Sequence, residues 1–282
     1  MQLRSLMSRG KARAPANEPR MQVSSLCIYP IKSCRGISVT AAQVQDIGLE
    51  DDRRFMVIDA ENRSLTQREC PAMARVGLAQ TSTGWSLSRV DLPTIRWDPM
   101  RYGTEVTARI WKDTITVVDQ GDAVAAWFSA ALERPCRLVG FAPGVRRLID
   151  PAFAVDAHDA VSFADGYASL LVTEESLADL NSRTKEEVPM DRFRPNIVVS
   201  GATAWEEDHW RNVQIGAIEM VAVKPCARCV VTTTNQKTGE RHVEPLHTMA
   251  VFRQIGHGFI FGQHMVHITT GTIRVGDAVV LR

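Results

Sequence analysis

The stretch "VAVKPCARCVVTTTN" (residues 221–235) places two cysteines, Cys226 and Cys229, three residues apart between two apolar runs. Both runs are rich in Val or Thr, which favour extended chain over helix. We therefore expect the cysteines to join two strands of a fold built mainly from strands. The spacing allows a disulfide, half of a zinc site, a redox-active dithiol or a single thiolate ligand.

The surroundings of the pair weigh against two of these chemistries. A redox dithiol draws its low thiol pKa from a helix that follows it, and "VVTTTN" disfavours a helix. A structural zinc needs four ligands; the chain has one C-x-x-C, and His264 and His267, three apart, face opposite sides of a strand. A thiolate that binds a metal or carries a persulfide remains, favoured by the charges of Lys224 and Arg228. Two unreactive thiols in a turn are the alternative.

Short extended segments recur along the whole chain. β-Branched or apolar runs bounded by Gly, Asp or Asn are found at residues 36–44, 53–59, 114–119, 195–201, 214–223, 229–234 and 271–282. Their close spacing leaves little room for βαβ crossovers, so we expect a mainly β (α+β) fold of antiparallel barrels or sandwiches with a few short helices. The last segment is expected to form a closing hairpin bent at Gly276-Asp277.

Two segments have helical periodicity. In "GDAVAAWFSAALERP" (residues 121–135) apolar residues recur at helical spacing, with Asp122 placed to cap the helix and Pro135 to end it. "TEESLADLNSR" (residues 173–183) begins with Thr173 as a candidate N-cap and carries two Glu in its first turn. We expect the first helix to close an N-terminal domain, with the boundary near residue 140.

The composition narrows the protein class. The chain has 282 residues, 45% of them hydrophobic and 23% charged, as in ordinary globular proteins. Its formal net charge is +1, so the overall charge does not favour binding to nucleic acid or to an anionic membrane. No apolar run is long enough for a membrane-spanning helix. Residues 1–20 are basic and lack an apolar core, so we expect a disordered leader rather than a secretory signal. Without an export signal, six cysteines predict reduced thiols in the cytoplasm.

Three loops at the ends of expected strands carry basic and hydrogen-bonding side chains. These side chains are Lys32, Ser33 and Arg35 in the first loop, Arg53 and Arg54 in the second, and Arg192, Arg194 and Asn196 in the third. If the loops converge, their donors suit a phosphate-bearing ligand rich in heteroatoms. Ordinary surface charge is the alternative. The phosphate loops of nucleotide-binding folds are absent from the sequence.

Together these motifs resemble those of a known family. The stretches "VSSLCIYPIKSCRGISV", "MDRFRPNIVVSG", "KPCARCVVTTTNQKTGE" and "GTIRVGDAVVL" are similar to MOSC proteins. The branch they resemble has an N-terminal MOSC β-barrel domain and contains the mitochondrial amidoxime-reducing component and the bacterial YcbX-type proteins. The resemblance runs from about Met21 to Arg282. It implies a MOSC N-terminal β-barrel domain over residues 21–140 and a MOSC domain over residues 141–282.

The resemblance also implies a site. A molybdenum cofactor, molybdenum bound to molybdopterin, would lie between the two domains, with Cys229 on the metal and Cys226 as its neighbour. The residues that would contact the cofactor are Lys32, Ser33, Arg54, Asp165, Arg194, Asn196, Ala227 and Cys229. In "FADGYASL" (residues 163–170) this chain has Gly166 and Tyr167 where relatives carry small hydroxyl residues, a departure that would reshape the substrate mouth.

The implied activity is the two-electron reduction of small N-hydroxylated compounds. Cys229 and Asp165 would be the catalytic residues, with Asp165 as the candidate proton donor. The sequence has no C-x₄-C-x₂-C run for a plant-type iron–sulfur cluster. Electrons would therefore come from a separate protein of the ferredoxin, cytochrome b5 or flavoprotein reductase type. Two other classes stay open: a sulfur carrier with a persulfide on Cys229, and a module that binds the cofactor without turnover. We expect no nucleic-acid or membrane partner.

Overall fold

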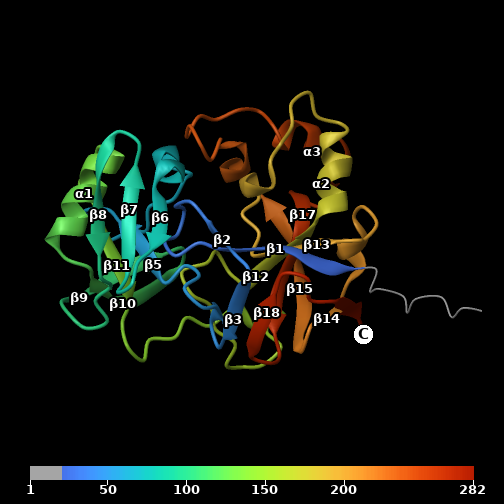
Figure 1. Ribbon diagram of the computed structural model, residues 1–282, viewed down its shortest axis with the longest axis horizontal. Helices are drawn as coiled ribbons and strands as arrows, with labels where there is room; N and C mark the ends of the chain where they lie inside the picture. The colour runs from blue at the N-terminus through green and yellow to red at the C-terminus, as the bar shows by residue number, and fades with distance from the viewer. Residues whose placement is uncertain (1–20) are drawn as a thin grey trace, which may run out of the picture.

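Strands dominate the architecture of the chain. The computed structural model describes residues 21–282, and the expected leader at residues 1–20 lies outside the described residues. Within residues 21–282 the largest sheet has nine strands, eight of them in the order β19 (Val279–Leu281), β14 (Asn212–Ile215), β15 (Ile218–Arg228), β17 (Gly258–His267), β12 (Ser169–Thr173), β13 (Ile197–Ser200), β1 (Gln22–Ile28) and β2 (Ile37–Val39), with β16 (Gln254–Ile255) beside β17. Figure 1 shows β1, β13, β14, β15 and β17 of this sheet together on the right of the molecule. The mainly β fold expected from the sequence is confirmed.

Three smaller sheets and three helices complete the described chain. The second sheet runs β5 (Phe55–Ile58), β11 (Arg137–Phe141), β10 (Asp113–Asp119) and β9 (Glu105–Ile110); the third runs β18 (Gly271–Arg274), β3 (Ala41–Gln45) and β4 (Gly48–Leu49); the fourth runs β6 (Gly77–Gln80), β7 (Trp85–Arg89) and β8 (Leu92–Trp97). The helices are α1 (Asp122–Leu132), α2 (Glu174–Asn181) and α3 (Leu246–Phe252). Short 3-10 turns lie at η1 (Pro71–Arg75), η2 (Pro151–Phe153), η3 (Met190–Arg192), η4 (Glu206–His209) and η5 (Val230–Thr233).

Strands from the two ends of the chain share sheets. β1 pairs with β13 and β2 with β1, so N-terminal strands extend the sheet formed mainly by the C-terminal half. β18 pairs in turn with β3. Among the strand pairings of residues 21–282, isolated bridges apart, only that of β12 with β13 is parallel, in keeping with the expected antiparallel fold. The domain boundary near residue 140 stays a prediction, but the sheets themselves are not divided there.

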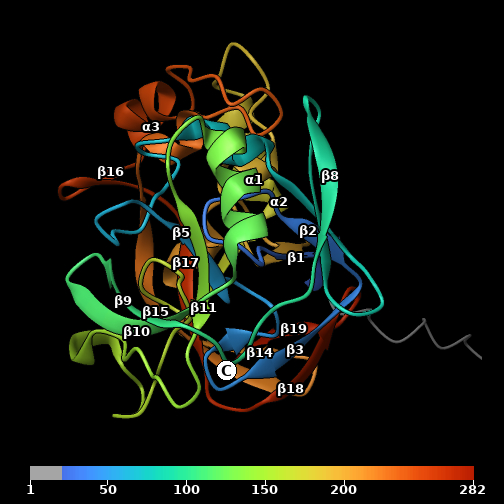
Figure 2. The same ribbon diagram turned by 90° about the vertical axis from the view of Figure 1, so that its left-hand side faces the viewer.

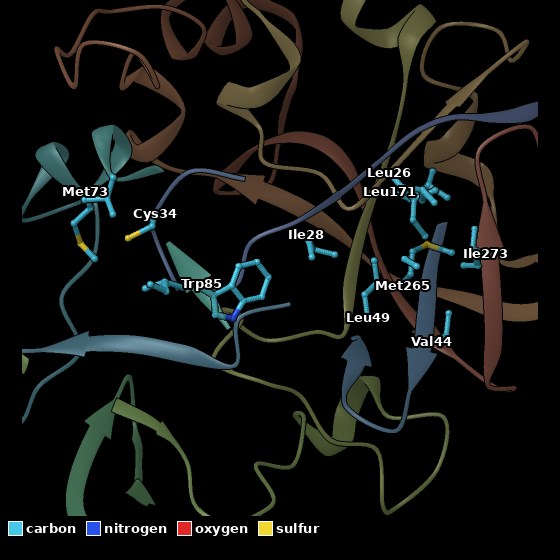
Figure 3. Packing of buried hydrophobic residues seen from close by; sticks show 14 of the residues in the cluster. Leu26, Ile28, Cys34, Val44, Leu49, Met73, Trp85, Leu171, Met265 and Ile273 are labelled. Atoms are coloured by element: carbon cyan, nitrogen blue, oxygen red, sulfur yellow. The ribbon is translucent and has the colours of Figure 1, made fainter. Parts of the chain in front are cut away.

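One hydrophobic core runs through both halves. In β7 the side chains alternate between buried and half-buried, which turns Trp85 and Leu87 inward, as the period of a strand requires. The same cluster of buried residues continues to Met265 of β17 and Ile273 of β18 (Figure 3). Each such side chain contributes about 1.5–3 kcal/mol when it is removed from water. Buried residues of both halves thus share one cluster.

The two expected helices are confirmed, with one change at a cap. Thr173 caps α2 by accepting a hydrogen bond from the backbone N–H of Ser176. In α1, Gly121 is the N-cap with φ at 94°, and Asp122 lies in the first turn without capping, where its charge pairs with Arg137. Figure 2 shows α1 on the outer side of the molecule, against β11. Within residues 21–282 the helices are all too short or too polar to cross a membrane.

The prediction of a closing hairpin at Gly276-Asp277 is wrong. The chain does bend there, with Gly276 at φ 90°, and Asp277 accepts a hydrogen bond from the N–H of Arg274 at 2.8 Å. The two flanking strands nevertheless pair with different partners, β18 with β3 and β19 with β14. The bend therefore carries the chain from one sheet to another.

Candidate functional site

The cysteine pair spans the end of β15 and the start of η5. A 3-10 turn begins directly after Cys229, so the second strand expected at residues 229–234 is wrong. The hydroxyls of Thr232 and Thr233 donate to the carbonyls of Cys229 at 2.9 Å and Val230 at 2.7 Å. These bonds to the backbone three residues earlier stabilise a helical turn that Thr and Val otherwise disfavour.

The two thiols of the pair have different surroundings. Cys226 is buried, and Nη1 of Arg228 lies 2.8 Å from its sulfur. Burial opposes ionisation of Cys226, but the charges of Arg228 and His264 outweigh it and lower the pKa of this thiol to about 6. Cys229 is partly exposed, with Nη2 of Arg68 3.3 Å from its sulfur. Cys229 is therefore the thiol more open to a ligand.

The predicted basic loops converge on one cavity of about 370 Å³. The predicted site residues that line this cavity are Lys32, Ser33, Asp165, Arg194, Asn196, Ala227 and Cys229. The Lys32 ammonium donates to the carbonyl of Phe163 at 2.9 Å and forms an ion pair with Asp165. Seven of the eight residues predicted to contact a cofactor thus lie around one space, although they come from four separate segments of the chain.

The eighth predicted residue, Arg54, is not in this cavity. Its guanidinium donates to the side chain of Gln45 at 3.1 Å and to the carbonyl of Leu49 at 3.2 Å, beside a separate hollow. Arg53 lines the cavity instead. Its backbone is left-handed, with φ at 49°, and its side chain reaches Asn196, whereas that of Arg54 reaches Gln45, so the two arginines face apart. Arg54 therefore lies outside the cavity that gathers the other seven predicted residues, and its neighbour Arg53 lies in the lining.

Arg53 is half-buried and stacks on a buried aromatic ring. The ring of Tyr29 lies between two guanidiniums, with that of Arg53 at 4.3 Å from the ring centroid and that of Arg194 at 4.2 Å. Nη1 of Arg53 also donates to Asp52 at 2.6 Å and to the side-chain carbonyl of Asn196 at 2.9 Å. Cation–π contacts and charged hydrogen bonds of this kind hold both arginines rigid at the cavity wall.

Asp165 is bound by two cations. Besides its ion pair with Lys32, its carboxylate accepts a hydrogen bond from Nη2 of Arg68 at 3.3 Å. Enclosure opposes ionisation, but Lys32 and Arg68 outweigh it and hold the pKa of Asp165 well below its usual range. Both contacts favour the carboxylate form of Asp165, and its expected role as proton donor stays a prediction.

Arg68 and Trp111, which are not among the residues predicted from the sequence, also line the cavity. The Arg68 guanidinium lies 4.6 Å from the centroid of the Trp111 ring. Neither residue lies in a recognisable motif, but the backbone marks the site. Eight non-glycine residues between 21 and 282 have positive φ, and four of them, Ser33, Arg53, Trp111 and Arg194, line this cavity. Left-handed conformations are costly for such residues and concentrate at functional sites.

His264 and His267 lie on opposite faces of β17, as strand alternation predicts. His264 lines the cavity, and its ring lies 4.6 Å from that of Tyr167. His267 is turned away, with a buried Nδ1 that has no hydrogen-bond partner. Over residues 21–282, no three His, Cys, Asp or Glu side chains are grouped so that they could hold a metal ion. A metal at Cys229 would thus need ligands from a bound cofactor.

The donors of the cavity fit a molybdenum cofactor. Lys32, Arg53, Arg68 and Arg194 supply positive charge for the anionic parts of such a ligand, and Cys229 supplies a thiol for its metal. This set of cationic donors and a thiol suits an anionic ligand that carries a metal.

Family models cover most of the sequence. The model "MOSC N-terminal beta barrel domain" matches residues 20–135, and the model "MOSC domain" matches residues 158–280. The chain belongs to the MOSC family. This MOSC protein is 35% identical to the mitochondrial amidoxime-reducing component 1 of Homo sapiens, over 92% of this chain and 82% of that protein. It is 36% identical to the same component of Mus musculus, over 95% of this chain and 85% of that protein.

The similarity extends to a second group of MOSC relatives. The mitochondrial amidoxime reducing component 2 of Bos taurus is 32% identical over 94% of this chain and 85% of its own length. The resemblance expected from the sequence motifs is thus confirmed over nearly the whole MOSC protein. Among solved structures, YiiM from Geobacillus stearothermophilus aligns with 41% of this chain and 54% of its own at a TM-score of 0.31 and 17% identity, too little to add to the assignment.

Proposed function

We propose that this MOSC protein is a molybdenum-cofactor-dependent reductase of N-hydroxylated compounds. The reaction is R–NHOH + 2 e⁻ + 2 H⁺ → R–NH₂ + H₂O. The observation that carries the proposal is the partly exposed thiol of Cys229 in a cavity lined by five cationic side chains, those of Lys32, Arg53, Arg68, Arg194 and Arg228. The relatives named as amidoxime-reducing components support the same chemistry. When bound, the cofactor supplies a two-electron redox centre with Lewis-acid character.

The side chains around Cys229 have separate tasks in this proposal. Cys229 is the metal ligand, and Lys32, Arg53 and Arg194 hold the anionic parts of the cofactor. The side chain of Asn196 is already engaged: its carbonyl accepts from Arg53 and its amide donates to Asp52 at 3.0 Å. Asn196 therefore acts as a positioning residue for Arg53.

Arg68 and Asp165 contribute to the reaction through their charges. The ionised Asp165 fixes Lys32 and Arg68 through its two ion pairs. Arg68 lies beside Cys229, where negative charge develops on the substrate oxygen as its bond to nitrogen breaks, and a fixed cation stabilises that charge. The two protons come from solvent in the open cavity, and the electrons from a separate redox protein of the ferredoxin, cytochrome b5 or flavoprotein reductase type.

The test is an amidoxime reduction assay on protein purified from a host that makes molybdopterin. With dithionite-reduced viologen as donor, we expect turnover that Cys229→Ser abolishes. Cys27→Ser is the matched control, because Cys27 is also partly exposed but does not line the cavity. Full turnover by Cys229→Ser would contradict the proposal. A persulfide on Cys229 in mass spectra, with no reduction by any donor, would indicate a sulfur carrier instead.

A further inference from the structure

Trp111 occupies an unusual position for a large apolar side chain. It lies in the two-residue turn between β9 and β10, is 49% exposed and has φ at 55°. Exposure of the indole forgoes the gain of burial, and the left-handed backbone adds a second cost. The fold carries both costs at a residue that lines the cavity around Cys229.

Two cations hold the Trp111 ring in place. The guanidinium of Arg68 lies 4.6 Å from its centroid and the ammonium of Lys32 lies 5.8 Å from it. Both cations also bind Asp165, and Arg68 reaches the sulfur of Cys229 at 3.3 Å. Arg68 thus lies between the indole and Cys229. From this position the indole can contact the part of a substrate that does not react.

Tyr167 adds a second aromatic surface to the same cavity. Its ring lies 4.6 Å from that of His264 at an interplanar angle of 32°, and the ring of Phe153 meets its edge at 6.0 Å. Burial and the charge of Asp150 raise the pKa of Tyr167 to about 12, so its hydroxyl is neutral. The cavity therefore combines two neutral aromatic faces with a cationic floor.

We propose that Trp111 is a specificity-determining residue, which favours N-hydroxylated substrates that carry a planar aromatic ring over those that lack one. The aromatic ring of the substrate packs on the indole while its N-hydroxyl group points toward Cys229. The surrounding cations favour neutral or anionic rings over cationic ones. This inference rests on the proposed reductase function, because it concerns the substrate of the same site.

The first test compares two amidoximes that differ only beyond the reacting group. In Trp111→Ala we expect KM for benzamidoxime to rise about three- to tenfold, the range of an aromatic pair, with kcat unchanged. KM for acetamidoxime should not change, and Trp111→Phe should keep most of the preference. Tyr102→Ala is the control, since Tyr102 is an exposed aromatic residue of the same half outside the cavity.

The second test measures binding without turnover. Benzamidoxime is titrated by calorimetry into the molybdenum-loaded protein with no electron donor, and Trp111→Ala should weaken binding by the same factor. Binding that depends on Trp111 without reduction by any donor would support this inference while the reductase function fails. Reduction of both amidoximes, with equal KM changes or none in Trp111→Ala, would overturn the inference and leave the reductase function standing.

Discussion

The guanidinium of Arg68 lies 3.3 Å from the sulfur of Cys229. Arg68 belongs to the N-terminal half of the chain and Cys229 to the C-terminal half, so this contact closes the cavity between segments 161 residues apart. The same guanidinium binds Asp165 and packs on Trp111. One side chain therefore links the proposed metal ligand to the residues that would contact the substrate.

Removal of the Arg68 charge should slow the reaction. A hydrogen bond to a charged group is worth about 1.5–3 kcal/mol, so Arg68→Met should lower kcat/KM per bound molybdenum about ten- to a hundredfold. Arg68→Lys should recover part of the loss. Arg54→Met is the control, because Arg54 faces away from the cavity and its replacement should change kcat/KM by less than about twofold. Full activity per molybdenum in Arg68→Met would show that its charge has no role.

The two neighbouring arginines should differ in cofactor retention. Arg53→Lys keeps the charge but loses the stack on Tyr29 and the forked bond to Asp52 and Asn196, since an ammonium cannot reproduce that geometry. We expect molybdenum per chain to fall in Arg53→Lys and to stay at the parent level in Arg54→Lys. Elemental mass spectrometry of both purified variants measures it. A loss of molybdenum in Arg54→Lys but not in Arg53→Lys would show that Arg54 is the residue that holds the cofactor.

Cys226 should titrate near neutral pH without holding the metal. With its pKa lowered to about 6, the thiol is ionised above this pH, and thiolate absorbance in the ultraviolet should rise through a step that Cys226→Ser removes. Because the folded pKa lies below the unfolded one, stability gained from this thiolate is lost as the pH falls through about 6. Molybdenum should remain in Cys226→Ser. If the metal is lost in that variant and kept in Cys229→Ser, the ligand is the other cysteine.

Asp165 should make the stability of the folded protein depend on pH in the acid range. Its pKa is lowered in the folded protein, so the stabilisation by Lys32 and Arg68 is present above the unfolded pKa of about 3.9 and is lost as the pH falls below it. The difference in melting temperature between the parent and Asp165→Asn should therefore be larger at neutral pH than in strong acid. Differential scanning calorimetry at several pH values tests this. A constant difference across the range would mean that the ion pairs contribute nothing.

Sequence patterns predicted the parts of the site that depend on local chemistry. Lys32, Ser33, Arg194 and Cys229 stand in motifs whose residue types suit the ligand, and the structure brings them to one cavity. The Thr173 cap was predictable for the same reason, because it depends on a side chain and a backbone group three residues apart.

The remaining features depend on conformation that no motif encodes. Arg53 and Arg54 have the same chemistry, so residue type does not tell which of them lines the cavity, and the left-handed backbone at Arg53 has no sequence signature. Arg68 and Trp111 reach Cys229 through tertiary packing of distant segments. At η5 the Thr hydroxyls bond to the backbone and override the strand preference of their residue type.

Metal content tests the central claim most directly. Protein purified from a host that makes molybdopterin is analysed by elemental mass spectrometry, together with Cys229→Ser and the control Cys27→Ser. We predict molybdenum near one atom per chain in the parent and in Cys27→Ser, and its loss in Cys229→Ser. Zinc in place of molybdenum, or no metal in any of the three proteins, would contradict the assignment of Cys229 as the ligand of a molybdenum cofactor.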